Sequence, residues 1–155
     1  MEETLITVQA TGYSKDGKMY TSGEVLENGK VTLWWSARSG IGDSVLAKYT
    51  ALYNALETLD TMNGLTQPAI ILIDSQAVIR QITGMWRVHR PEVSALLNMI
   101  AILCNKASEN GTRIYLRWTP RKTFKTMYEG LRNAASGQGH NTISSNISQR
   151  EDISP

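Results

Sequence analysis

The feature that most constrains the fold is an uninterrupted run of five apolar residues, Ala69–Ile73, which ends at the acidic residue Asp74. An apolar run this short, with Pro68 just before it and Ser75 just after Asp74, is typical of a β-strand. Because the run has no polar alternation, it indicates a strand that is covered on both faces. We therefore expect an α/β fold with 69–73 near the centre of the sheet.

Three strands are expected before this run. The ranges 5–8, 19–26 and 30–35 are rich in β-forming residues, and an Asn-Gly pair between the second and third is a strong hairpin signal. Gly12 is expected to begin a turn, and 39–42 a loop. This part of the chain predicts an antiparallel meander.

The remaining elements follow from helical spacing and from start and stop signals. Helices are expected over 44–60, 75–82, 91–109 and 123–135, and a strand over 113–118. The order β-β-β-α-β-α-α-β-α predicts a mixed sheet flanked by helices. A length of 155 residues suits one domain, which we place at 1–136. We expect the Ser-, Asn- and Gln-rich residues 137–155 to form a disordered tail.

The order and spacing of several segments resemble the type 1 ribonuclease H family. Residues 71–79 are similar to its fourth strand (T-D-S-x-x-V), and 47–56 to its first helix (A-E-x-x-A-L-x-x-A-L). Further likenesses are those of 8–12 to V-D-A-S or T-D-G-S, of 118–120 to W-V-P, and of 128–131 to A-D-x-L. The resemblance implies a ribonuclease H-like mixed five-stranded sheet, with three antiparallel strands followed by parallel ones.

The resemblance also implies a site of four carboxylates that hold two Mg²⁺ ions for phosphodiester hydrolysis. The four positions fall on Gln9, Lys48, Asp74 and Glu129, so that two carboxylates remain. The local charge changes from about −4 to about −1, which disfavours two divalent cations. We expect no bound metal, or an ion at Asp74 if there is one, and an ion pair between Lys48 and Asp74. On position alone, Asp74 could instead cap the following helix.

Charge is distributed unevenly along the chain. Residues 80–132 hold ten Lys and Arg against three acids, whereas the rest holds six against eleven. A basic segment with interleaved Trp favours nucleic-acid binding. The candidate binding residues are Trp86, Arg87, Arg90, Arg117, Arg121, Lys122 and Lys125. Two alternatives stay open: the charges are dispersed for solvation, and Trp86 and Trp118 are core or rim residues.

Three functions therefore remain open. The first is a nucleic-acid-binding protein, for RNA or an RNA/DNA hybrid, with an eroded and inactive site. The second is a divergent Mg²⁺-dependent endonuclease that uses Asp74 and Glu129. The third is a protein-interaction scaffold. The lone Cys104, together with an N-terminus that lacks a secretory pattern, leads us to expect a cytoplasmic or nuclear location. No apolar stretch is long enough for a membrane span.

Overall fold

The computed structural model describes residues 5–84, 90–124 and 142–144. The strands are β1 (Ile6–Lys15), β2 (Lys18–Glu27), β3 (Lys30–Ile41), β4 (Ala69–Ile73), β5 (Ile114–Trp118) and β6 (Thr142–Ser144). The helices are α1 (Ser44–Asn63), α2 (Gln76–Ile82) and α3 (Pro91–Glu109), with a 3₁₀ turn, η1, at Arg121–Phe124. None of the helices in these ranges is long and apolar enough to span a membrane.

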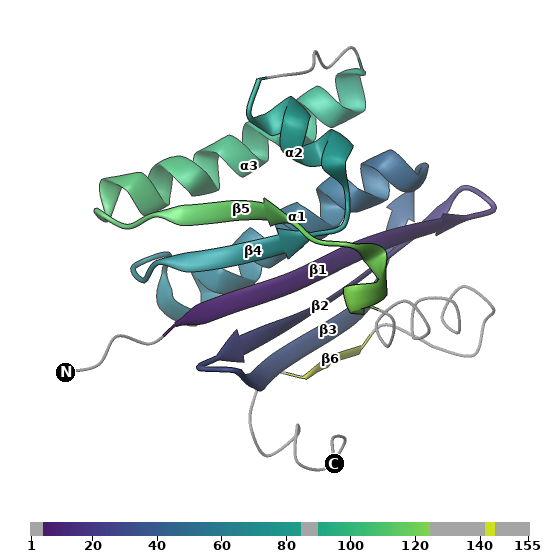
Figure 1. Ribbon diagram of the computed structural model, residues 1–155. Coiled ribbons are helices and arrows are strands. Elements are labelled where there is room, and N and C mark those ends of the chain that lie inside the picture. The colour runs from purple at the N-terminus through teal and green to yellow at the C-terminus, as the bar shows by residue number, and fades with distance from the viewer. Residues whose placement is uncertain (1–4, 85–89, 125–141, 145–155) are drawn as a thin grey trace.

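The strands form one mixed sheet in the order β5-β4-β1-β2-β3-β6 (Figure 1). β1, β2 and β3 are antiparallel, and β4 pairs in parallel with both β1 and β5. The expected five-stranded sheet is therefore confirmed. β6 adds a short antiparallel strand at the β3 edge and lies within 137–155, where we expected only a disordered tail.

Left-handed backbone conformations make both hairpin turns. Asp16 and Gly17 have φ values of 54° and 77°, and Asn28 and Gly29 have values of 53° and 83°. Two successive residues with positive φ are the requirement of the tight turn that matches the twist of a β-hairpin. The Asn-Gly hairpin is confirmed, whereas the first turn lies at Asp16-Gly17 and the prediction that it begins at Gly12 was wrong.

Gly12 has a different role, which explains why β1 continues through it. It pairs with Thr21 in the ladder between β1 and β2. A Cβ atom at this position would lie 2.3 Å from the carbonyl oxygen of Ala47 in α1. Glycine is thus required by the close approach of helix and strand, not by a turn. The predicted loop at 39–42 is also shorter than expected, because β3 extends to Ile41.

The hydrophobic core lies between the sheet and helices α1–α3. Val8, Ala10, Ile71 and Ile73 are fully buried there, together with the inner face of α1. On the other side of the sheet, Phe124 of η1 packs against partly buried residues of β1 and β4. The alternation along β4 thus separates a helix-covered face from one that receives η1.

Candidate functional site

Asp74 follows β4 directly, at the end of the sheet where parallel strands terminate. Its side chain has no exposed surface. The chain just after β5 lies beside the end of β4. The backbone N–H of Thr119 donates to the carbonyl oxygen of Ile73 over 2.9 Å. Ligands of open α/β sheets bind at this edge, outside the carboxyl ends of the strands.

Asp74 is not the cap of the helix that follows it. The N-cap of α2 is Ser75, whose side-chain oxygen accepts a hydrogen bond from the backbone N–H of Val78. The capping alternative for Asp74 is therefore wrong, and its carboxylate is available for other contacts.

Three side chains meet at this position, and we call them the Lys48–Thr11–Asp74 cluster. Lys48 Nζ lies 2.9 Å from Asp74 Oδ2 and 3.0 Å from Thr11 Oγ1. The Thr11 hydroxyl, which accepts from the ammonium, donates to the Asp74 carboxylate, whose oxygens are 3.1 and 3.0 Å away. The expected ion pair between Lys48 and Asp74 is confirmed, and it is buried, with 9% of the Lys48 side chain exposed.

The local fold positions Lys48 through the close packing of α1 on β1. Asp43 caps α1 by accepting from the backbone N–H of Leu46 over 3.0 Å, which sets the first turn of the helix. Ala47 then lies against Gly12 of β1. Because the strand carries no side chain at that point, the neighbouring Lys48 reaches Thr11.

On β1 the residue that meets Asp74 is Thr11 rather than Gln9. The parallel register pairs Gln9 with Leu72 and Ala10 with Ile73, so that Thr11 comes next to Asp74. Gln9 and Thr11 are two residues apart and therefore lie on the same face of β1. For this reason the alternation of side chains along the strand could not distinguish them. A signal was present, however, since Thr11-Gly12 matches the D-G of T-D-G-S.

The charge of the cluster determines its chemistry. The described atoms supply one carboxylate, one ammonium and one hydroxyl, and the last two are unsuitable for replacing the carboxylates of a divalent-cation site. Within 5–84, 90–124 and 142–144, no group of three or more His, Cys, Asp or Glu side chains converges. Glu129, the other candidate carboxylate, lies outside the described residues.

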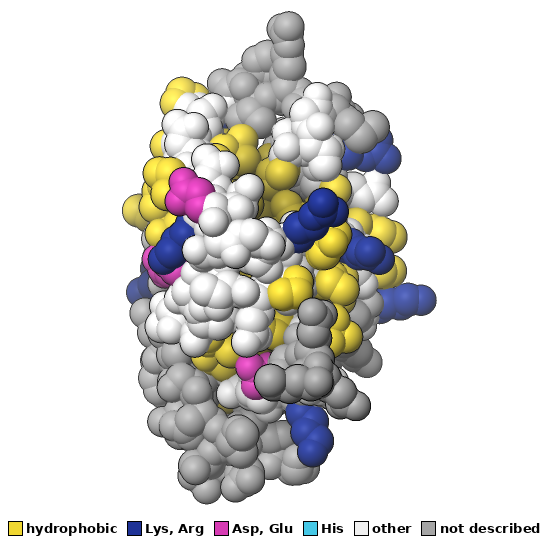
Figure 2. Space-filling view, turned by 90° about the vertical axis from the view of Figure 1, so that its left-hand side faces the viewer, with side chains coloured by type: hydrophobic (Ala, Val, Ile, Leu, Met, Phe, Trp, Pro, Cys, Tyr) yellow, Lys and Arg dark blue, Asp and Glu magenta, His cyan; other side chains and the backbone are white. Residues whose placement is uncertain are grey.

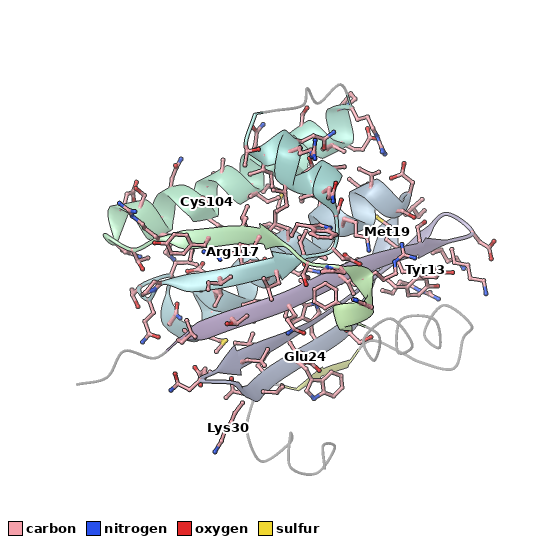
Figure 3. The ribbon with its side chains drawn as sticks, viewed as in Figure 1. Tyr13, Met19, Glu24, Lys30, Cys104 and Arg117 are labelled. Carbon is pink, nitrogen blue, oxygen red and sulfur yellow. The ribbon has the colours of Figure 1, made fainter. Side chains whose placement is uncertain are left out.

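Exposed basic and aromatic side chains follow the same edge of the sheet. Arg117 on β5, seen in Figure 3, and Arg121 and Lys122 of η1 are exposed, and Trp118 is 45% exposed. This exposure excludes a core position for Trp118 and is compatible with a position at the rim of the core. Figure 2 shows the opposite end of the molecule, where β1, β4 and β5 begin; most Lys and Arg visible there lie on the right-hand half, and the visible Asp and Glu lie to the left and below.

Arg90 differs from these residues because acids neutralise it. Its guanidinium lies 2.8 Å from Asp43 and 2.7 Å from Glu92. The hydrogen bond from the backbone N–H of Leu46 lowers the pKa of Asp43 most, and Arg90 lowers it further. Burial raises this pKa, but the net effect is a pKa below the usual value. The candidate residues Trp86, Arg87 and Lys125 lie outside the described residues.

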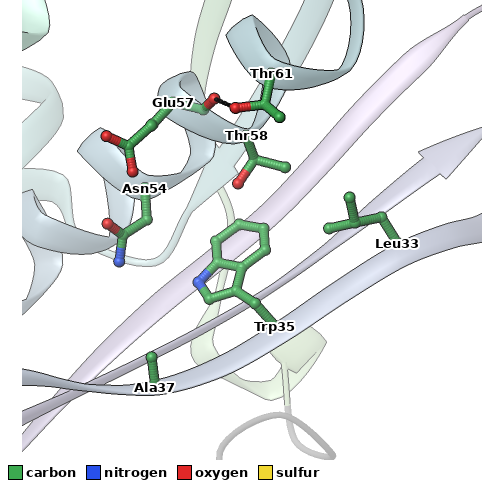
Figure 4. Close-up of a pocket in the computed structure, with 7 residues that line it drawn as sticks. All are labelled: Leu33, Trp35, Ala37, Asn54, Glu57, Thr58 and Thr61. Carbon is green, nitrogen blue, oxygen red and sulfur yellow. Dashed lines mark hydrogen bonds between the residues drawn. The ribbon is translucent and has the colours of Figure 1, made fainter. Parts of the chain in front are cut away.

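A hollow of about 290 Å³ lies between β3 and α1 (Figure 4). Its lining is Leu33, Trp35, Ala37, Asn54, Glu57, Thr58 and Thr61. It shares no residue with the Lys48–Thr11–Asp74 cluster. We assign the candidate site to this cluster together with the exposed residues Arg117, Trp118, Arg121 and Lys122, which we call the β5–η1 edge.

Comparisons with known proteins agree with this architecture. A family profile described as reverse transcriptase-like matches residues 22–127. No curated protein matches the sequence significantly. Among solved structures, the N-terminal RNase H domain of a Mycobacterium tuberculosis protein, solved as a fusion with maltose-binding protein, superposes with a TM-score of 0.73 at 21% identity. It covers 88% of this chain and 100% of that domain.

Two further structures show the same fold. RNase H1 from the archaeon Halobacterium salinarum has a TM-score of 0.70 at 19% identity, over 78% of this chain and 89% of its own. LC11-RNase H1, solved in complex with an RNA/DNA hybrid, has a TM-score of 0.68 at 20% identity, over 76% of this chain and 87% of its own. Since the profile spans more than half of the sequence, the chain belongs to the reverse transcriptase-like family, and its fold is that of ribonuclease H.

Proposed function

We propose that this protein binds nucleic acid, RNA or an RNA/DNA hybrid, on a ribonuclease H fold whose two-metal site no longer catalyses hydrolysis. The observation that carries the loss of hydrolysis is the buried ion pair between Lys48 Nζ and Asp74 Oδ2 at 2.9 Å. The cation that neutralises this carboxylate is part of the chain itself.

Electrostatics argue against a divalent ion beside this pair. A dication about 4 Å from an ammonium is repelled by about 8 kcal/mol at an effective dielectric constant of about 20. Thr11 offers a neutral oxygen where a second carboxylate would offset that repulsion. The residues of the cluster therefore do not fit a pair of Mg²⁺ ions, and we assign them no hydrolytic step.

The binding surface that we propose is the β5–η1 edge. Arg117, Arg121 and Lys122 offer cations for phosphates, and the exposed Trp118 offers a ring on which a base can stack. This edge adjoins the carboxyl end of β4 through the hydrogen bond from Thr119 to Ile73. The fold shared with LC11-RNase H1, which was solved with an RNA/DNA hybrid, supports the same class of ligand.

A salt-dependent titration tests binding. Fluorescence anisotropy with a labelled RNA/DNA hybrid, single-stranded RNA and duplex DNA should give an affinity that falls linearly on a log–log plot against salt. Arg117→Ala and Arg121→Ala should each flatten the slope by about one unit. Lys30→Ala, a basic residue at the β2–β3 turn, is the matched control and should leave the slope unchanged. Absence of binding at low salt would favour the protein-interaction scaffold.

A cleavage assay tests the loss of catalysis. The protein should not cleave an RNA/DNA hybrid in Mg²⁺ or Mn²⁺. Turnover that Asp74→Asn abolishes would overturn the loss of catalysis and favour the divergent nuclease, and a further loss in Glu129→Gln would then test the second carboxylate.

A gain-of-binding variant tests the electrostatic explanation directly. Lys48→Glu combined with Thr11→Asp supplies acidic groups, so Mg²⁺ should raise the melting temperature of this double variant and not that of the parent. Lys48→Gln combined with Thr11→Asn is the uncharged control and should show no shift. If the acidic variant folds and does not respond to Mg²⁺, the ammonium is not what prevents metal binding.

A further inference from the structure

Helix α3 carries on its outer surface a stripe of exposed residues with an apolar centre and a charged residue at each end. Glu92, Ala95, Met99, Ile102 and Lys106 follow one another at alternating spacings of three and four residues, so they lie on one side of the helix. All five are exposed, and Met99 and Ile102 are 43% and 67% exposed. We call these five residues the α3 stripe.

The stripe is not an extension of the core. The buried residues of α3 are Val93, Ile100 and Ala107, which belong to its inner side, and α3 packs on α1. No charged residue occurs between Glu92 and Lys106. A surface helix normally places charged side chains on its outer face, so an uncharged stretch with exposed Met and Ile is typical of an interaction surface.

We propose that the α3 stripe is a self-association surface, on which two copies of this chain pair their α3 helices antiparallel around a two-fold axis at Met99. Glu92 and Lys106 lie seven residues before and seven residues after Met99. In an antiparallel pair centred on Met99, Glu92 of each copy faces Lys106 of the other. Ala95 of each copy then lies beside Ile102 of the other, and the small alanine side chain allows the two helices to approach.

The charges at the two ends are accessible for this pairing. The side chains of Glu92 and Lys106 are 47% and 48% exposed. Each already has a partner within its own chain, Arg90 for Glu92 and Asp60 for Lys106. An ammonium has three donors and a carboxylate has two oxygens, so a second contact fits each group.

The apolar centre supplies most of the association free energy, since exposed ion pairs contribute little. The charges decide the orientation, because a parallel pair would place Glu92 against Glu92 and Lys106 against Lys106. Association through one helix from each copy buries a small area, so we expect a weak, concentration-dependent dimer.

Sedimentation equilibrium of the full chain over about 1 μM to 1 mM tests the proposal. The parent should show a monomer–dimer equilibrium, and Met99→Lys combined with Ile102→Lys should remain monomeric. Ile41→Lys, at an 84% exposed apolar residue outside α3, is the matched control and should dimerise like the parent. A parent that stays monomeric over the whole range would overturn the proposal, and so would a dimer that tolerates the Met99 and Ile102 changes.

Charge reversal tests the orientation. Glu92→Lys alone and Lys106→Glu alone should each weaken the dimer roughly tenfold, because the two-fold axis repeats every changed pair. The double variant should recover parental affinity, and an equimolar mixture of the two single variants should associate more tightly than either one alone. Failure of both recoveries, with folding checked by circular dichroism, would rule out the antiparallel arrangement.

Discussion

Replacing Lys48 with Met should destabilise the protein strongly. Methionine keeps the length and helix propensity of the side chain and removes its charge. The Asp74 carboxylate, whose side chain is fully buried, then keeps the Thr11 hydroxyl as its hydrogen-bond donor from the cluster. The desolvation of Asp74 remains while the attraction that offsets it is lost.

The structure sets the magnitude of this effect. Two unit charges separated by the 2.9 Å between Lys48 Nζ and Asp74 Oδ2 attract by about 6 kcal/mol at an effective dielectric constant of about 20. Local relaxation and the entry of water recover part of that loss, so we expect a cost of about 3–5 kcal/mol. For a chain of 155 residues this corresponds to a fall in melting temperature of roughly 10 °C.

Urea denaturation followed by circular dichroism measures the free energy of unfolding. Lys48→Met combined with Asp74→Asn removes both charges, and it should cost only about 1 kcal/mol, since no unpaired buried charge remains. Lys106→Met breaks the exposed pair with Asp60 and should cost less than about 1 kcal/mol. A similarly small cost for Lys48→Met alone, with no recovery in the double variant, would refute the buried pair.

Three further predictions concern other parts of the fold. The folded-state pKa of Asp43 lies below its unfolded value. Its contribution to the free energy of unfolding should therefore be full above about pH 4 and lost as the pH falls through the folded pKa. Asp43→Asn should flatten this pH dependence of the free energy of unfolding. Burial raises the pKa of the Cys104 thiol, so Ellman's reagent should react with it more slowly at pH 7 than after unfolding in urea. Gly12→Ala should destabilise the protein by about 3 kcal/mol in the same urea assay, because the new Cβ would lie 2.3 Å from the Ala47 carbonyl oxygen.

Much of the fold could be predicted because local signals and tertiary structure agree. The apolar run at Ala69–Ile73 is the strand β4, with the expected bounds, and it is an interior strand next to the β5 edge. Pro91 begins α3, and the helix ends at Glu109, just before the expected Asn-Gly pair. At these positions the hydrophobic period, the preference of proline for a first turn and the tolerance of glycine for positive φ all favour the same structure.

The length of the first strand could not be predicted from local signals. Gly12 has the sequence appearance of a turn residue, yet it lies within β1 because β2 pairs with it and α1 packs directly above it. The short strand at Thr142–Ser144 likewise depends on an edge offered by β3, more than 100 positions earlier in the chain. Such non-local pairings override weak local propensity.

The candidate site shows the same division. The sequence by itself determined that Asp74 ends an interior strand and that Lys48 lies early on the first helix, where an acidic residue would be expected from the family resemblance. Only the tertiary structure decided that Thr11, and not Gln9, completes the cluster, through the parallel register of β1 against β4. The physical reason is that the side-chain period of a strand is two residues, so both residues lie on one face and only the register distinguishes them.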